Sequence, residues 1–142
     1  MTARLIGERI DLVETLNRYR DEMPAGRDGA MACFIGSMRN MNMGDSVQAM
    51  ALEHYPEMTQ RFLDDLCAAQ MSARPLNDIL IVHRYGELSP GDDIVLVACW
   101  SAHRADAFDA CREAMEALKS QAPFWKREVT AEGDRWVHDL QD

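Results

Sequence analysis

The spacing of apolar side chains along the chain predicts three helices and six strands. Apolar residues that recur every three or four positions mark the helices, and short β-branched runs bounded by turn formers mark the strands. Helices are expected at residues 10–20, from Pro56 to the break at Arg74-Pro75, and at 104–121. Strands are expected at residues 29–38, 47–54, 78–85, 93–101, 124–130 and 135–137. The predicted order is therefore α-β-β-α-β-β-α-β-β.

The helix after Pro56 indicates which of its faces is buried. Met58, Phe62, Leu66 and Ala69 recur along one face, and the pattern ends where Arg74-Pro75 breaks the helix. An apolar stripe of this kind turns toward the core. We therefore expect these four side chains to be buried.

The turn-forming residues between the predicted strands indicate the fold class. Pro90-Gly91 marks a turn between residues 78–85 and 93–101, which we expect to pair as central strands. The segment Arg39 to Ser46 is rich in Asn, Gly, Asp and Ser, and we expect it to be a long, mobile connection. Strands joined by tight turns as well as by helices favour an α+β fold with a mostly antiparallel sheet. No repeat or linker divides the chain, so we expect one domain over residues 1–142.

Composition and charge exclude several function classes. The chain has 15 Lys and Arg residues against 24 Asp and Glu residues, a formal net charge of -9. Nucleic-acid binding needs a basic face that neutralises phosphates, so we expect no nucleic-acid partner and any anion site must be a local cationic pocket. No signal-peptide core and no apolar run of about 20 residues is seen. We therefore expect a cytoplasmic protein without a membrane segment.

The cysteines and histidines do not form a metal-binding pattern. The four cysteines are Cys33, Cys67, Cys99 and Cys111. They form no CxxC pair and each lies in an apolar segment, so reduced, buried thiols are expected rather than a metal site. The histidines without a partner at ligand spacing are His54, His83 and His138. No phosphate loop is present either, so we expect neither a metal nor a cofactor.

The candidate chemistry centres on the segment LKSQAPFWKRE, which carries Lys119 and Lys126. On an ideal helix, Lys119 lies about 20° from Phe108 on one side and Met115 about 20° from Phe108 on the other, so Lys119 points with the apolar stripe. The alternative is a lysine on the last turn that reaches into solvent and favours the helix dipole.

Residues beyond Pro123 bring a second lysine into the same neighbourhood. Strand alternation puts Phe124, Lys126 and Glu128 on one face. We therefore expect Lys119 and Lys126 to converge on one pocket beside an aromatic wall. A lysine there could act as a base or nucleophile, or stay charged and stabilise an oxyanion.

Two further sites could bind an anion. His103 and Arg104 follow Ser101 where a strand runs into a helix, so backbone N–H groups and the helix dipole would add to their side chains. The alternative is an ordinary helix start with a solvated charge. Arg39 ends a strand, and its guanidinium could grip a phosphate or carboxylate through two hydrogen bonds, although such a residue is often a simple surface arginine.

Taken together, several segments resemble the large, MoaE-type subunit of molybdopterin synthase. The segments are GAMACFIGSMRNMNMGDSV, LEHYPEM, VHRYGELSPGDD, SAHRADAF, LKSQAPFWKRE and EGDRWV. They occur in the family's order and at close spacing between Gly29 and Val137, so the match is far more specific than any single segment.

The resemblance implies a fold, a reaction and partners. It implies an α+β, hammerhead-like fold and a homodimer that binds, at each end, a small ubiquitin-like sulfur-carrier subunit with a C-terminal Gly-Gly thiocarboxylate. The assembly would be a heterotetramer. Its reaction would move sulfur from two thiocarboxylates onto cyclic pyranopterin monophosphate, open the cyclic phosphate and form the dithiolene of molybdopterin. The large subunit would carry neither a metal nor a redox cofactor.

The resemblance also implies which residues form the pocket. The substrate-binding residues would be Ser37, Met38, Arg39, His103, Arg104, Lys119, Lys126, Arg127 and Glu128. Lys119 would act at the reacting centre and Lys126 would assist by charge and positioning. Two features depart from the family: Ser37 stands where a lysine is common, and the tail HDLQD is short and acidic where relatives often continue with basic residues.

Two other functions remain open. A non-catalytic module could bind a ubiquitin-like tail as a scaffold or regulator, because an apolar surface and a pocket would serve that purpose as well. A generic small-anion-binding domain would need no ubiquitin-like partner.

Overall fold

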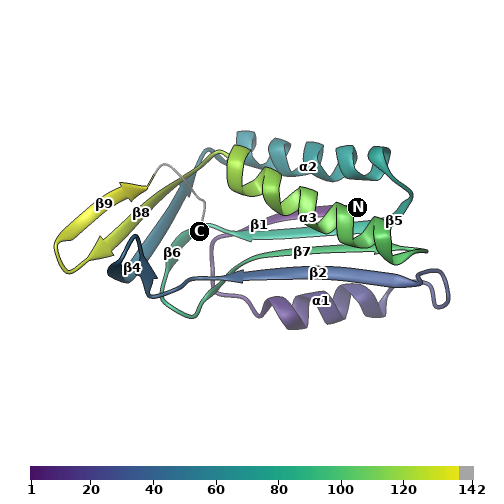
Figure 1. Cartoon of the computed structure of the whole chain (residues 1–142), viewed down its shortest axis with the longest axis horizontal. Helices are drawn as coiled ribbons and strands as arrows, with labels where there is room; N and C mark the ends of the chain where they lie inside the picture. The colour runs from purple at the N-terminus through teal and green to yellow at the C-terminus, as the bar shows by residue number, and fades with distance from the viewer. Residues whose placement is uncertain (138–142) are drawn as a thin grey trace.

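The first of two sheets forms the long body of the molecule. Within residues 1–137, which the computed structural model describes, this sheet has four strands in the order β1-β5-β7-β2 (Figure 1). They are β1 (Thr2–Ile6), β2 (Ala30–Ser37), β5 (Leu76–Arg84) and β7 (Asp93–Ser101). β5 and β7 pair antiparallel at the centre, as predicted, and β1 runs parallel to β5. The tail HDLQD lies outside the described residues.

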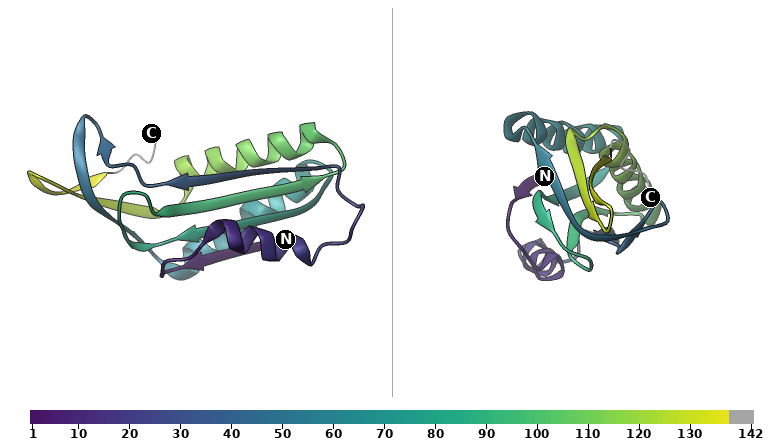
Figure 2. Two further views of the ribbon diagram at one scale, coloured as in Figure 1. Left: turned by 90° about the horizontal axis from the view of Figure 1, so that it is seen from below. Right: turned by 90° about the vertical axis from the view of Figure 1, so that its left-hand side faces the viewer.

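Three helices cover the two faces of this sheet in the described part of the chain. α1 (Leu12–Asp21) lies on one face, and α2 (Pro56–Ala73) and α3 (Arg104–Gln121) lie on the other (Figures 1 and 2). Alternation along β5 divides the core accordingly: Ile79 packs with the α2 and α3 side, and Leu80 with the α1 side.

The second sheet stands at one end of the body (Figure 2). It contains β3 (Met41–Asn42), β4 (Asp45–His54), β8 (Phe124–Thr130) and β9 (Gly133–Val137), with β6 (Gly86–Leu88) also paired to β4. All of these pairings are antiparallel. The predicted α+β class with a mostly antiparallel sheet is confirmed.

The buried face of α2 differs from the prediction. Met58 is 54% exposed and Ala69 is also exposed. The buried residues of α2 are Thr59, Leu63, Leu66, Cys67 and Gln70. Apolar residues occur on more than one side of this helix, so the stripe chosen from the sequence is rotated away from the face that meets the sheet.

The segment Arg39 to Ser46 is a tight hairpin and not the long connection that we predicted. β3 and the start of β4 pair through Asn42 and Asp45, leaving Met43 and Gly44 as a two-residue turn. Both turn residues have positive φ, 52° and 81°, which is typical of the tight turns that match strand twist.

The cysteine prediction is correct for three of the four thiols. Cys67, Cys99 and Cys111 are buried, whereas Cys33 is exposed, and all four are free. Cys33 lies on β2, the edge strand of the first sheet, where one side is less covered.

Candidate functional site

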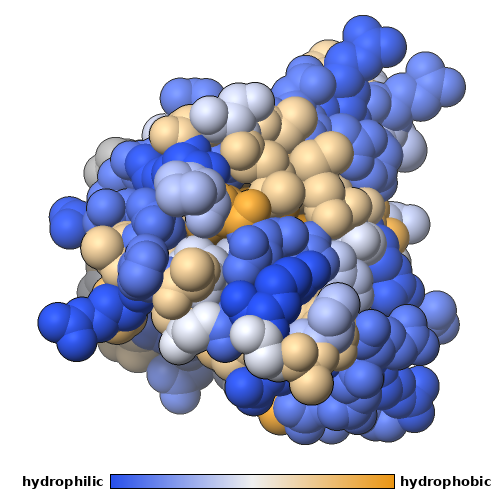
Figure 3. Space-filling model, turned by 90° about the vertical axis from the view of Figure 1, so that its right-hand side faces the viewer, coloured by the Kyte–Doolittle hydropathy of each residue, from blue (hydrophilic) through white to orange (hydrophobic). Residues whose placement is uncertain are grey.

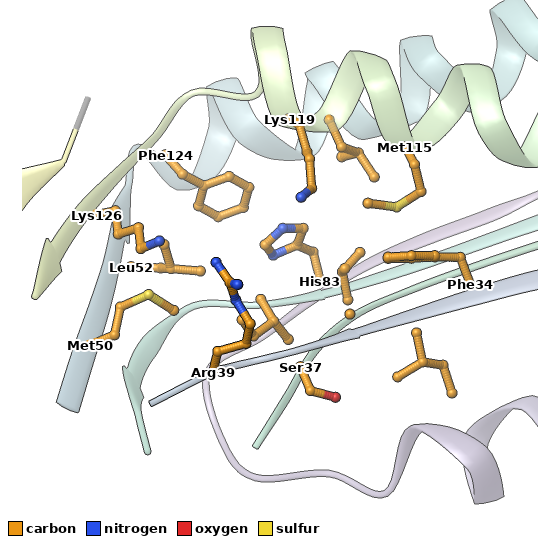
Figure 4. A pocket seen from close by; sticks show the side chains of 15 residues that line it. Phe34, Ser37, Arg39, Met50, Leu52, His83, Met115, Lys119, Phe124 and Lys126 are labelled. Atoms are coloured by element: carbon orange, nitrogen blue, oxygen red, sulfur yellow. The ribbon is translucent and has the colours of Figure 1, made fainter. Parts of the chain in front are cut away.

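A cavity of about 290 Å³ lies where the two sheets meet the C-terminal end of α3 (Figure 4). Its apolar wall is formed by side chains from both sheets and from α3, among them Phe34, Met50, Leu52, Ile94, Met115 and Phe124. Its polar lining consists of Ser37, Arg39, His83, Lys119 and Lys126. Because the wall is apolar, charges inside the cavity interact more strongly than they would in water.

Lys119 and Lys126 are the only two lysines in the 142-residue sequence, and both line this cavity. Lys119 is on the last turn of α3, and Lys126 is on β8. Between them, Ala122 leaves the helix with extended backbone and Pro123 carries the chain into β8. Both ammonium groups point into the same space in Figure 4. All of the lysine side chains of this chain therefore lie in one cavity.

The reason that we gave for the direction of Lys119 needs correction. Phe108, which served to define the buried stripe, is 64% exposed. The face of α3 that meets the sheet consists of Ala107, Ala110, Cys111, Ala114 and Leu118. Small alanines on this face let the helix approach the sheet closely. Lys119 follows Leu118, the last residue of this face, and is half-buried at its margin.

Lys126 is held by a buried carboxylate. Its Nζ lies 3.5 Å from Glu128 Oε2, and both residues are buried, as strand alternation predicted. Asn42 donates from Nδ2 to both Glu128 oxygens, at 3.1 and 2.9 Å, and Arg135 donates from Nε to Oε1 at 3.1 Å. A hydrogen bond to Asp45, with help from Glu128, raises the pKa of Arg135. Glu128, the counter-charge of Lys126, is thus held by hydrogen bonds that link the β3–β4 hairpin to the β8–β9 hairpin.

Arg39 enters the cavity from the end of β2, where Ser37 and Met38 are fixed to a neighbouring turn. The Ser37 hydroxyl donates to Asp93 Oδ1 at 2.7 Å and points away from the cavity in Figure 4. Met38 exchanges backbone hydrogen bonds with the turn at Gly91, and its side chain is buried. Arg39 alone of this segment directs a charge into the cavity (Figure 4).

His83 is a residue of this site that the sequence reasoning missed. It lies on β5 in the same row as Ile79 and Ile81, facing α3, and it stacks on Phe124 with ring centroids 4.2 Å apart. Its Nδ1 is 2.7 Å from the backbone oxygen of Arg84. Burial lowers its pKa to about 4. The available signal was the period of two along β5, which puts His83 on the core side.

The structure does not bring His103 and Arg104 to this cavity. They begin α3 and are exposed, whereas Lys119 is on its last turn, about 22 Å further along the helix axis. The end of the molecule that carries them is mostly hydrophilic (Figure 3). The length of the helix predicted at residues 104–121 already implied this separation within one chain, because each residue adds about 1.5 Å along the axis.

Arg127 also lies away from the cavity lining. It is on the opposite side of β8 from Lys126, and its Nη1 donates to Asp134 at 2.9 Å. Glu128 does not line the cavity either, but it contacts Lys126 as described above.

Within residues 1–137, no group of three or more His, Cys, Asp or Glu side chains is arranged to hold a metal ion. None of the helices in this part of the chain combines the length and apolar character that crossing a membrane requires.

Comparison with known proteins identifies the family. The model of the MoaE protein family matches residues 5–121. The chain is 56% identical to the molybdopterin synthase catalytic subunit of Salmonella typhimurium over 110 residues, which are 78% of this chain and 73% of that protein. The corresponding subunit of Escherichia coli is 53% identical over 110 residues, with the same shares covered.

Solved structures agree with this match. The MoaE protein of Burkholderia ambifaria has a TM-score of 0.80 at 42% identity, covering 99% of this chain and 90% of that one. Molybdopterin synthase from Staphylococcus aureus has a TM-score of 0.83 at 30% identity, covering 94% of each chain. The chain belongs to the MoaE protein family.

Proposed function

We propose that this chain is the catalytic subunit of a molybdopterin synthase, a sulfurtransferase of molybdenum cofactor biosynthesis. It transfers sulfur from the C-terminal thiocarboxylate of a small ubiquitin-like subunit to cyclic pyranopterin monophosphate and forms the molybdopterin dithiolene. The observation that carries the proposal is the cavity in which both lysines of the chain lie beside Arg39. The names of the 56% and 53% identical relatives support it.

The charges of the cavity suit this reaction. The guanidinium of Arg39 can hold a phosphate by two hydrogen bonds, and this supplies the local cationic pocket that a chain of net charge -9 needs for an anionic substrate. Lys119 acts at the reacting carbonyl, where attack on an acyl carbon creates an oxyanion. Lys126, held next to Glu128, positions the substrate and adds positive charge.

The shape of the cavity suits the tail of the partner. A Gly-Gly end has no side chains, so it can enter a cavity of about 290 Å³ that would exclude a bulkier peptide. Exposed apolar side chains near this end of the molecule, including Met41, Met43 and Trp136, offer a surface on which the body of the small subunit can rest. In the cytoplasm, two copies of this chain and two small subunits form the heterotetramer.

His103 and Arg104 take part through a second copy of the chain. They belong to the family's pocket set, yet in one chain they lie about 15 residues of α3 away from Lys119, or about 22 Å along the axis. In a homodimer with two-fold symmetry, the exposed start of one α3 can reach the cavity of its partner. Their role is to hold the phosphate or pterin oxygens there.

A reconstituted reaction tests the function. The chain is mixed with thiocarboxylated small subunit and cyclic pyranopterin monophosphate, and the dithiolene product and consumed thiocarboxylate are measured. We expect two thiocarboxylates to be consumed for each dithiolene formed. A small subunit that ends in an ordinary carboxylate is the matched control and gives no product. Binding of the small subunit without any product would instead favour the non-catalytic module.

A further inference from the structure

The carboxylate of Glu128 is shared by two cations that reach it from different strands. Glu128 is only 2% exposed, so its charge must be satisfied by the protein and not by water. Oε1 accepts a hydrogen bond from Arg135 Nε at 3.1 Å, and Oε2 lies 3.5 Å from Lys126 Nζ. Asn42 Nδ2 donates to both oxygens, at 3.1 and 2.9 Å. Side chains of β3 and β9 therefore engage both oxygens before Lys126 is counted.

The distances show that Arg135 is the closer cationic partner of this carboxylate. Its 3.1 Å contact is a hydrogen bond between charged groups, whereas the 3.5 Å of Lys126 exceeds the roughly 2.7–3.2 Å typical of N–H···O bonds. Lys126 is therefore attracted to Glu128 without being tied to it by a short hydrogen bond. Figure 4 shows the Lys126 ammonium directed into the cavity. Its N–H groups can thus turn to a substrate there.

Arg135 is itself held in place by two other contacts. It donates from Nη1 to Asp45 Oδ2 at 2.7 Å and from Nη2 to the backbone oxygen of Asn42 at 3.1 Å. With the bond from Nε to Glu128, each of the three guanidinium nitrogens has an acceptor, and the planar group cannot rotate without losing one. A guanidinium also stays charged at every physiological pH. Arg135 therefore offers Glu128 a charge of fixed position and sign.

We propose that Arg135 is a positioning residue for Lys126: it shares the Glu128 carboxylate and so leaves the lysine ammonium available to an anionic substrate. Without Arg135, a movement of about 0.7 Å would bring Lys126 Nζ to the ~2.8 Å of a charge-assisted hydrogen bond with Glu128. The lysine would then be turned toward the carboxylate instead of the cavity. The link to catalysis rests on the proposed function, whereas the sharing of the carboxylate rests on the contacts alone.

The local charge balance gives this sharing a consequence for binding. Lys126 and Glu128 alone would carry no net charge, whereas the three side chains Lys126, Glu128 and Arg135 together carry one positive charge. The other partner of Arg135, Asp45, has a side chain that is 50% exposed, so water screens its carboxylate. Because the cavity wall is apolar, a bound anion responds strongly to the charge beside Lys126.

Nitrogen NMR of the lysines tests the proposal in the wild-type protein. Because the sequence has only two lysines, ¹⁵N-lysine labelling gives two side-chain signals, and Lys119→Met assigns them by removing one. Inorganic phosphate serves as the anionic probe. We expect phosphate to shift the Lys126 signal, since this ammonium is available to an anion. A Lys126 signal that phosphate leaves in place would overturn the proposal.

Replacement of Arg135 tests its share of the effect. Arg135→Met keeps an unbranched stem and removes the charge, so it should move the Lys126 signal and leave that of Lys119 nearly unchanged. The KM for the pterin substrate should rise about 10-fold, as for the loss of one hydrogen bond to a charged group, with kcat within about threefold of wild type. Arg135→Lys should recover most of the loss, because an ammonium can still donate to Glu128.

A surface arginine provides the matched control. Arg18 is exposed on α1 and pairs with Glu14, far from the second sheet in sequence and fold. Arg18→Met should therefore leave both the KM and the two lysine signals unchanged. An unchanged KM in Arg135→Met as well would overturn the positioning role.

A double-mutant cycle separates this role from a purely structural one. If Arg135 acts through Glu128, Arg135→Met should raise KM little further once Glu128→Gln has removed the carboxylate charge. Equal increases of KM with and without Glu128→Gln would overturn the positioning role. If wild-type protein formed no dithiolene at all, the proposed function would fail, and the phosphate titration would still decide whether Lys126 is available. Because that titration uses native Arg135, it does not depend on whether a variant folds.

Discussion

Acidification of the protein is expected to reduce its stability through His83. The folded protein keeps the pKa of this imidazole at about 4, compared with an ordinary value of 6.5, because the ring is buried. Between these two pH values the unfolded chain binds a proton on His83 and the folded protein does not, so the free energy of unfolding falls as the pH falls. For these two pKa values the loss between pH 7 and pH 5 is about 2 kcal/mol.

Urea unfolding of the wild-type protein and His83→Gln at several pH values measures this effect. Other groups that titrate in this range, including His54, are present in both proteins, so their contributions cancel in the difference. Gln at position 83 does not titrate. We expect the stability of His83→Gln relative to wild type to rise by about 2 kcal/mol between pH 7 and pH 5.

A stability difference between the two proteins that stays constant within about 0.5 kcal/mol over this range would refute the reasoning, since uncertainty in extrapolated values is of that order. It would mean that the folded protein protonates His83 near the ordinary pKa and that water reaches the ring.

Three further changes test other parts of the structure. Glu128→Gln removes the buried counter-charge of Lys126 and should cost about 3 kcal/mol in urea unfolding, and a loss below about 0.5 kcal/mol would contradict the pairing. Gly29→Ala would drive a Cβ into the backbone oxygen of Ala102 and should cost about 2 kcal/mol in thermal unfolding, whereas wild-type stability would show that the backbone yields easily. Co-expressed Lys119→Ala and Arg104→Ala chains should recover roughly a quarter of wild-type turnover, because half of the dimers are mixed and each mixed dimer has one intact site; no recovery would contradict the contribution of a second copy.

Local signals in the sequence were sufficient for much of the fold. The helix at residues 104–121 and the strand at 124–130 have the predicted bounds because Pro123 separates them. The side-chain directions of β8 were also predictable, since a period of two allowed Lys126 and Glu128 to be assigned to one buried face.

Features that depend on distant segments were not predictable from local signals. β1 (Thr2–Ile6) was missed because its partner is β5, more than 70 residues away, as in the pair Thr2 and Leu80. The sequence also could not decide which apolar side of α2 or α3 meets the sheet, since both helices carry apolar residues on several sides.

The residues of the candidate site also divide into those that the local sequence could predict and those whose position depends on distant segments. Lys119 and Lys126 are close in sequence and joined by one bend, so the direction of Lys126 followed from strand alternation, whereas the helical stripe used for Lys119 was not the buried face of α3. His83 was discounted because it has no sequence neighbour of matching chemistry, although strand pairing and α3 place it in the cavity. The family resemblance placed His103 and Arg104 in one pocket with the lysines, but within one chain the length of α3 separates them.

The most direct test is single-turnover dithiolene formation by Lys119→Ala beside Arg112→Ala. Arg112 lies on the same helix with its side chain 81% exposed and paired to Glu116, so its loss should leave turnover unchanged. We expect Lys119→Ala to fold, to bind the small subunit and to form product more than about 100-fold more slowly than wild type. Near-normal product formation by Lys119→Ala would contradict the claim that the lysine cavity is the reaction site.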